Sequence, residues 1–366
     1  MSISQQSRYA TKAEVLRALA PFAKPGNAKG LVMYSIDFAL YWLAIAAVIF
    51  APWLALKIIA SVFAGLKLSS FVTMGHDAGH KSLVKSTRLN RWLGIMCFIP
   101  CMHNYRLWIW DHYQFHHLGT NGQHFDSYTP FSKADFDMLP RYRQVFERII
   151  RSPTVVGFGI HYFFQRMLGV RIFPTAKVPK NQRGSAWRHF ALVVAYHVAF
   201  VAALYNAPAV AQIGSATAVV LGYIVPFFVF CCLTGGSLYL MHTHRRIPWF
   251  RGESDTNRTG RIFKLTATNL TLPGPLSHLV HNIFSHSAHH AHAGVPTYNL
   301  RLAQQRLDEL LGDDVVVEPL SLGGALATLK ACKLYDYENN QWLDFDGRPT
   351  APAIRVALEE DYAAAA

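Results

Sequence analysis

The chain has 366 residues, of which 51% are hydrophobic, 13% aromatic and only 16% charged, and its formal net charge is +13. Soluble domains carry about a quarter charged residues, so this composition favours a membrane protein over a soluble one. The cysteines are odd in number and lie mostly in or beside apolar runs. This pattern disfavours an exported scaffold held by disulfides.

Four apolar segments are long enough to cross a bilayer, because a span needs about 20 mainly apolar residues. The first two are separated by a tight uncharged turn, and the last two by a short uncharged link. The sequence therefore predicts an all-α integral membrane protein with four transmembrane helices in two hairpins. The predicted spans cover residues 31–50, 53–75, 190–208 and 217–241. Two weaker apolar segments, 92–102 and 155–170, are predicted to be interfacial or re-entrant helices.

The basic residues indicate how the chain is oriented. Apart from Lys57 and Lys67, which can snorkel towards the ends of the second span, every Lys and Arg lies outside the spans and their two short links. Positive residues gather on the cytoplasmic side of a membrane. We therefore expect both termini to be cytoplasmic, with residues 76–188 and 242–347 forming a cytoplasmic helical cap. This patterning also accounts for the net charge without nucleic-acid binding, since a basic stripe for nucleic acid would not be divided by apolar spans.

The chain thus divides into an N-terminal cytoplasmic segment (1–30), a membrane domain (31–347) and a C-terminal tail (348–366). Histidines gather in three groups that are expected just beyond the cytoplasmic ends of the spans: "HDAGH" (His76, His80), "HYQFHH" (His112, His116, His117) and "HSAHH" (His286, His289, His290). On a helix, positions i, i+3 and i+4 share a face, so each group can aim imidazoles at one point. Three such groups on one side of a membrane indicate a metal site.

The number of imidazoles bears on the number and kind of ions. One zinc ion takes about four ligands, whereas the three groups offer eight histidines, so two ions are expected. Imidazole suits zinc, copper, iron and nickel alike. Zinc supports only hydrolysis or structure, while long apolar helices beside the site point to a substrate rich in C–H bonds, which needs oxygen and a redox metal. Iron is the leading candidate, with a zinc-dependent membrane hydrolase and a non-catalytic metal-storage or lipid-binding protein as alternatives.

The three histidine boxes, together with "MHTHRRIPWF" and "HNIFSHSAHHAHAGVPTYNL", resemble the membrane fatty-acid desaturase superfamily, nearest the omega-6 type acyl-lipid desaturases of bacteria. The likeness runs from about residue 30 to residue 347 and includes the tail "CKLYDYENNQWLDFDG". It implies a bacterial inner-membrane enzyme that introduces a double bond into a lipid-linked or free acyl chain. Sister oxygenases of the superfamily, which hydroxylate lipids or alkanes or oxidise carotenoids, share the pattern and remain an alternative.

The resemblance also implies a non-haem centre of two iron ions, O2 as the oxidant, and electrons from a separate ferredoxin or similar carrier. By matching motif positions, all eight box histidines become metal ligands and catalytic residues. A ninth imidazole is expected from His242 at the end of the fourth span or from His281 before the third box. Asp77 and Asp111 adjoin ligands and are expected either to orient a coordinating imidazole or to serve as ordinary helix caps. The second box departs from the usual pattern, because "LWIWD" precedes its histidines where many relatives have tryptophan and arginine.

Overall fold

The computed structural model describes residues 10–117, 120–122, 128–175, 178–207, 213–252, 254, 257–258, 260, 262 and 265–356. Parts of the predicted segments lie outside the described residues: residues 1–9 of the N-terminal segment, residue 208 of the third span, residues 357–366 of the tail, and short stretches of both predicted cap segments. The chain forms two compact units. Unit 1 contains residues 1–24, 113–153 and 237–366, and unit 2 contains residues 25–112 and 154–236.

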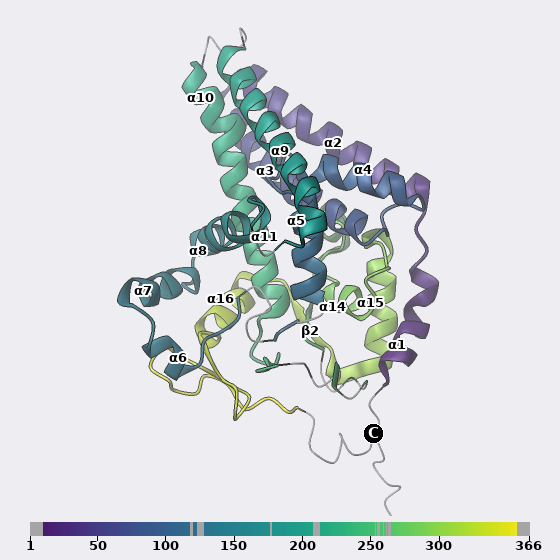
Figure 1. Ribbon diagram of the computed structural model, residues 1–366, viewed down its shortest axis with the longest axis vertical. Coiled ribbons are helices and arrows are strands. Elements are labelled where there is room, and N and C mark those ends of the chain that lie inside the picture. Colours follow the sequence, from purple (N-terminus) through teal and green to yellow (C-terminus); the bar gives the residue numbers. More distant parts are fainter. Residues whose placement is uncertain are drawn as a thin grey trace, which may run out of the picture. The chain divides into compact units, whose positions relative to one another are not determined.

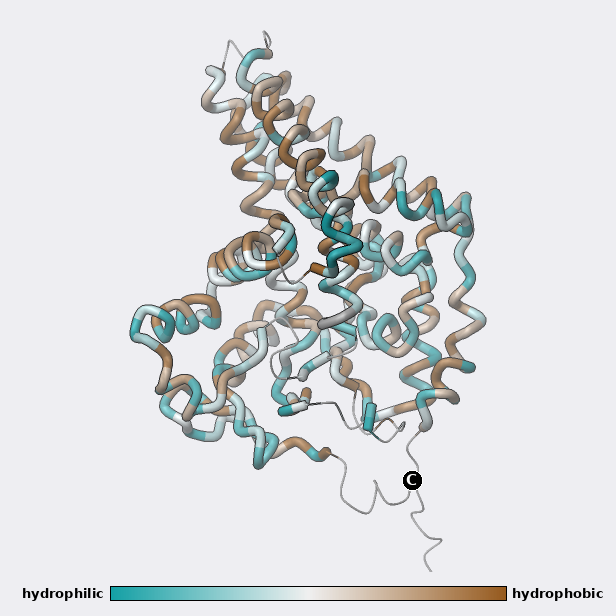
Figure 2. Tube along the Cα trace, viewed as in Figure 1, coloured by the Kyte–Doolittle hydropathy of each residue, from teal (hydrophilic) through white to brown (hydrophobic). Residues whose placement is uncertain are grey.

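Four helices in the described part of the chain are long and apolar enough to cross a membrane. They are α2 (Asn27–Phe50), α3 (Leu54–Gly79), α9 (Lys180–Asn206) and the run of α10 (Ser215–Val219), η5 (Val220–Ile224) and α11 (Val225–His242). Figure 2 shows long hydrophobic stretches along each of them. The prediction of four apolar helices is therefore confirmed, but α3 and α9 extend into polar residues that the hydropathy pattern assigned to loops. Helical backbone hydrogen bonds continue past an apolar stretch wherever neighbouring residues tolerate them.

Two lysines of α3 have buried partners. The Lys67 ammonium lies 2.9 Å from the Asp37 carboxylate of α2, and both side chains are less than a twentieth exposed. The Lys57 ammonium donates to the carbonyl oxygens of Val48 and Ile49 at the end of α2. The prediction that Lys67 snorkels is wrong, because Asp37 offers it an opposite charge inside the helix pair, which removes the need to reach water.

Shorter helices complete unit 2: α4 (Thr87–Phe98), α5 (Tyr105–Asp111), α8 (Val155–Ile160) and the π-helical η3 (His161–Arg171). The close approach of α3 and α4 depends on Gly75, where an added Cβ would lie 2.5 Å from the Phe98 ring. Phe98 in turn packs with Tyr105 and Trp108 of α5 in a buried aromatic cluster. This packing holds α5 beside the last turn of α3, which carries His76.

Unit 1 contains most of the remaining elements: α1 (Lys12–Leu19), η1 (Ala20–Phe22), α6 (Lys133–Asp137), α7 (Arg141–Ile150), α13 (Gly274–Leu279), α14 (His286–Ala291), α15 (Thr297–Leu311), η6 (Gly312–Asp314) and α16 (Leu322–Ala331). The π-helix η2 (His112–His117) enters it from unit 2. The helices α1 and α15 lie side by side (Figure 1), with Val15 and Leu19 packed in one core with Leu300, Leu307 and the α14 residue Ala288. This core anchors α14, which carries the third histidine group.

In the described part of the chain, four short strands modify the all-α prediction. The strand β1 (Thr268–Thr271) pairs in parallel with β2 (Val316–Pro319), and β3 (Leu334–Asp336) pairs antiparallel with β4 (Gln341–Leu343). Each is only three or four residues long. Such short pairs satisfy the backbone groups of segments that leave a helix, and they carry too little periodicity to be recognised in a sequence.

Candidate metal centre

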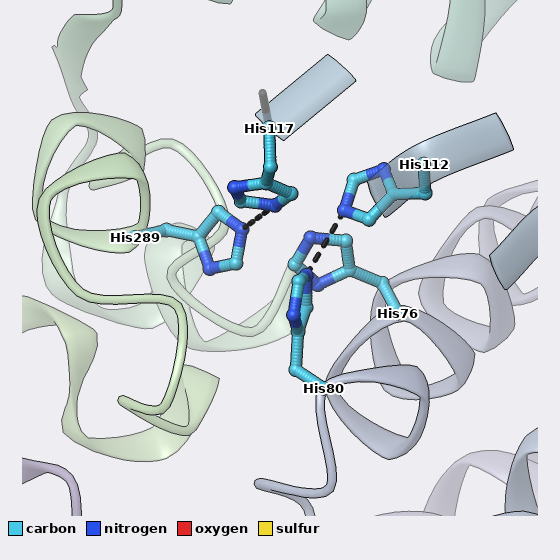
Figure 3. A group of neighbouring side chains, drawn as sticks. All are labelled: His76, His80, His112, His117 and His289. Atoms are coloured by element: carbon cyan, nitrogen blue, oxygen red, sulfur yellow. Dashed lines mark hydrogen bonds between the residues drawn. The ribbon is translucent and has the colours of Figure 1, made fainter. Parts of the chain in front are cut away.

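Unit 2 brings together His76, His80 and His112, from the first and second predicted groups. His76 lies in the last turn of α3, His80 caps that helix, and His112 begins η2. The Nε2 atoms of His80 and His112 are 3.0 Å apart, and the His76 ring centre lies 4.7 and 4.8 Å from the other two. Figure 3 shows the three rings turned towards one another.

An ion network in unit 2 surrounds the residue before His112. The Asp111 carboxylate lies 2.6 Å from the guanidinium of Arg166 and 3.3 Å from that of Arg171, and all three side chains are largely buried. Asp111 is therefore an anchor for two arginines of η3, and neither expected role, orienting an imidazole or capping, describes these contacts. A carboxylate so close to two guanidinium groups is paired and hydrogen-bonded, as a buried charge requires.

The same network continues to His103. Arg171 donates to the Tyr162 hydroxyl oxygen at 3.2 Å, Tyr162 lies 2.8 Å from Nε2 of His103, and Nδ1 of His103 lies 2.6 Å from the Cys101 carbonyl oxygen. Burial, and next the charge of Arg171, lower the pKa of His103 to about 3. A neutral ring that donates through Nδ1 and accepts through Nε2 satisfies every one of these contacts.

Unit 1 contains a second group, made of His116, His242, His286 and His290. One ring nitrogen from each lies within 4.8 Å of those of the others. The Nε2 atom of His286 is 2.9 Å from that of His242 and 3.1 Å from that of His290. These residues come from η2, the end of α11 and the helix α14, which are far apart in the sequence.

His117 and His289 both belong to unit 1, and their Nε2 atoms lie 3.2 Å apart (Figure 3). The second and third boxes therefore each divide: His116 and His117 point in different directions, as do His289 and His290. Consecutive residues on a helix are about 100° apart, whereas His286 and His290 are one turn apart and share a face. The prediction that each box aims its histidines at one point is therefore wrong for His289 in the third box. It is also wrong for the second box, because His112 and His116 belong to different groups.

The two candidates for the additional ligand have different surroundings. His242 belongs to the second group, and its Nδ1 atom lies 3.2 Å from the Thr266 carbonyl oxygen. His281 belongs to neither group of clustered histidines that the described residues form, although it is buried and has a φ of 55°. His244, two residues after His242, is buried. Its Nδ1 atom accepts from the Arg246 backbone N–H, and the Glu318 carboxylate lies 3.6 Å from its Nε2 atom.

The imidazoles fit a metal ion. Nitrogens bound at about 2.1 Å from one ion are separated by about 3.0–4.2 Å, which is close to the spacing within each group. Burial, and next the neighbouring His286, His242 and His116, hold the pKa of His290 well below its usual value. A neutral imidazole offers a lone pair, as coordination requires. Asp77 supports His76, whose Nδ1 atom lies 3.4 Å from the carboxylate. Sets made of imidazole suit iron, zinc, copper and nickel.

Thr120 and Asn121 lie just after the second box and were not among the predicted site residues. The Thr120 hydroxyl lies 3.4 Å from Nδ1 of His290, and the Asn121 side chain contacts the backbone carbonyl of His242. A signal was present in "GTNG", because Thr and Asn in a turn often bond to nearby backbone groups. The signal could not reveal which distant backbone they reach.

Comparison with known proteins places these residues in a family. The family model for fatty acid desaturase matches residues 51–318. The chain is 28% identical over 273 residues to an sn-1 oleoyl-lipid 12-desaturase of Arthrospira platensis, covering 74% of this chain and 72% of that protein. It is 27% identical to a chloroplastic omega-6 fatty acid desaturase of Spinacia oleracea, covering 86% and 66%, respectively.

A third relative is an sn-1 acyl-lipid omega-3 desaturase (ferredoxin) of Synechocystis sp., 27% identical, with 67% of this chain and 65% of that protein covered. The matched family region contains every histidine of both groups. Because the family match covers most of the chain and the structure supplies histidine groups able to hold metal, the chain belongs to the fatty acid desaturase family and is an oxidoreductase that desaturates fatty acids.

Proposed function

We propose that this chain holds two iron ions and uses them with O2 to introduce a double bond into the acyl chain of a membrane lipid. The observation that carries the proposal is the group of His116, His242, His286 and His290, in which three distant segments supply four imidazoles with ion-like spacing. Several relatives are named as acyl-lipid desaturases, which supports the lipid-linked substrate.

We assign the first ion to this group, including His242 as the additional ligand in preference to His281. We assign the second ion to His76, His80 and His112 of unit 2. The Nε2 atoms of His80 and His112, which lie 3.0 Å apart, support this assignment. His117 and His289 stay predicted ligands by their motif positions. Iron bound to these imidazoles would supply one-electron redox chemistry and O2 activation.

Two neighbouring groups would orient the imidazole ligands. The Thr266 carbonyl oxygen can accept from Nδ1 of His242, and Asp77 can accept from Nδ1 of His76, which leaves each Nε2 atom available to a metal. Converting two neighbouring methylenes to a double bond while reducing O2 to two waters requires two more electrons and two protons. We propose that a separate ferredoxin-like protein supplies these electrons, as the name of the Synechocystis relative indicates for that enzyme.

The membrane arrangement is also proposed. The four apolar helices form two hairpins in a bacterial inner membrane, within a domain over residues 31–347 between an N-terminal segment and a tail. The basic residues outside the spans support cytoplasmic termini and a cytoplasmic metal centre. The acyl chain would reach the centre from the lipid phase.

The test uses the full chain in lipid nanodiscs with a reductant, a ferredoxin and monounsaturated glycerolipids. We expect about two iron ions per chain and a product two hydrogens lighter, with the new double bond located by mass spectrometry. The variant His286→Ala should lose iron and product, while His278→Ala, at an exposed histidine outside both groups, should retain both. A hydroxylated product would identify a sister oxygenase, and an active enzyme with zinc alone would contradict the proposal.

A further inference from the structure

Thr120 and Asn121, in the turn after the second histidine box, form hydrogen bonds with backbone carbonyl groups. Asn121 is fully buried and has a φ of 56°, in the left-handed region that asparagine tolerates better than most residues. Thr120 precedes it and is partly exposed. Both lie in unit 1, which also contains their contacts His116, His242, Pro248, Phe250 and His290.

Asn121 ties the second box to the segment that leaves α11. Its side-chain amide donates to the carbonyl oxygens of His242 at 3.2 Å and Pro248 at 3.0 Å. Its own carbonyl oxygen accepts from the Phe250 backbone N–H at 2.9 Å, and Gly122 forms a parallel bridge with Phe250. Because one rigid amide bonds near both ends of residues 242–250, it fixes the position of His242 relative to the box that carries His116.

Thr120 makes the corresponding contact to the third box. Its hydroxyl donates to the His116 carbonyl oxygen and lies 3.4 Å from Nδ1 of His290. A hydroxyl has one hydrogen, so once it is given to His116 the oxygen can only accept from His290. That contact favours the tautomer of His290 with its proton on Nδ1, which leaves Nε2 unprotonated and facing Nε2 of His286.

We propose that Thr120 and Asn121 are positioning residues for the proposed metal site of His116, His242, His286 and His290. Asn121 sets the placement of His242, and Thr120 sets the tautomer and ring orientation of His290. The inference rests on the proposed function, because it assumes that this group holds a metal ion. Neither residue touches substrate or supplies a ligand.

The chain offers matched variants for a test. Thr120→Val removes the hydroxyl while keeping the shape, and Thr120→Ser keeps the hydroxyl. Asn121→Gly removes the amide but accepts the same backbone conformation. Asn340, with a φ of 52° in the β3–β4 turn, provides the same chemical change at a site outside both histidine groups.

The experiment is a cobalt(II) titration of the metal-free full-length protein in detergent, followed by absorption spectroscopy. We expect Thr120→Val and Asn121→Gly each to weaken one of two cobalt sites by about 10–100-fold and to change its ligand-field bands. The other site should keep its affinity, and Thr120→Ser and Asn340→Gly should resemble the unmodified protein.

The outcomes separate this inference from the proposed function. If the unmodified protein binds no cobalt or iron, the proposed metal centre fails. If it binds two ions and Thr120→Val binds both with the same affinity and spectrum, only the positioning role fails. Should Asn121→Gly not fold, the comparison of Thr120→Val with Thr120→Ser decides the matter alone.

Discussion

Trp108 stacks face to face on His112, with ring centres 4.3 Å apart and planes inclined by 20°. Trp108 is buried and also meets His76 edge-on, at 5.7 Å between ring centres. Trp108 also packs against Phe98, and the Arg171 guanidinium lies 5.9 Å from the centre of its ring. The indole therefore fixes the plane of one histidine of the proposed metal centre without being a ligand.

Replacing Trp108 with leucine should loosen His112. We expect the affinity for the second metal ion to fall by about 10-fold or more, because a ring that rotates freely is less often in the coordinating orientation. Metal binding is measured by isothermal titration with cobalt(II). Trp92→Leu is the control, since Trp92 is 66% exposed. Equal affinities in both variants would show that the stacking has no role in ligand orientation.

Replacing Asp111 with asparagine should destabilise unit 2. The change leaves the guanidinium groups of Arg166 and Arg171 without their buried carboxylate, and breaking such a pair costs about 3–5 kcal/mol. The matched control is Asp137→Asn, because the Asp137 pair with Lys133 is exposed and such pairs contribute about 0.5 kcal/mol or less. Thermal unfolding in detergent measures both. A similar melting temperature for the two variants would contradict the structural role of Asp111.

The buried His103 should make stability depend on pH. Burial and Arg171 lower its pKa to about 3, whereas an unfolded histidine has a pKa of about 6.5. Between these values the unfolded chain binds a proton that the folded chain does not. The contribution of neutral His103 to the free energy of unfolding is therefore complete above about pH 6.5. It is lost as the pH falls towards 3, by up to about 1.4 kcal/mol per pH unit.

The measurement compares the metal-free protein with His103→Gln from pH 7 to pH 5. The free energy of unfolding should fall more steeply for the unmodified protein, so the difference between the two should shrink as the solution becomes more acidic. Other titrating groups are common to both proteins and cancel. Parallel curves would mean that His103 accepts a proton in the folded state at ordinary pH.

Replacing His242 or His281 with asparagine should identify the additional ligand. His242→Asn removes an imidazole from the group around His286, so iron content should fall by about half and desaturation should cease. His281→Asn should retain iron, and asparagine suits the left-handed φ of 55° at this position. Iron is counted by elemental analysis. Loss of iron from His281→Asn alone would reverse the assignment.

Much of the architecture could be predicted from the sequence, because membrane spans depend on local composition. The apolar stretches around Ala44 and Val193 lie within the observed helices α2 and α9. Hydropathy could not place the ends of these helices, since α3 continues through His76 to Gly79 after its apolar residues have ended. Nor could it show that Lys67 has Asp37 as its partner, a pairing across 30 positions of sequence.

The candidate site shows the same division. The three histidine groups were visible because ligands one turn apart on a helix leave a spacing that can be read directly. Adjacent residues such as His116 and His117 serve different groups, which depends on the direction of each side chain around η2. The ion pairs of Asp111 with Arg166 and Arg171 likewise depend on the packing of two helices that are distant in the sequence.

By itself, the sequence determined the apolar helices and the imidazole supply, because periodicity and composition act within one helix and need no knowledge of neighbours. Only the tertiary structure shows which histidines face one another. It also shows that the Asn121 side chain donates to the backbone carbonyl oxygen of His242, which lies 121 positions later. Those contacts arise from packing between segments, and packing is set by shape and burial that no local pattern contains.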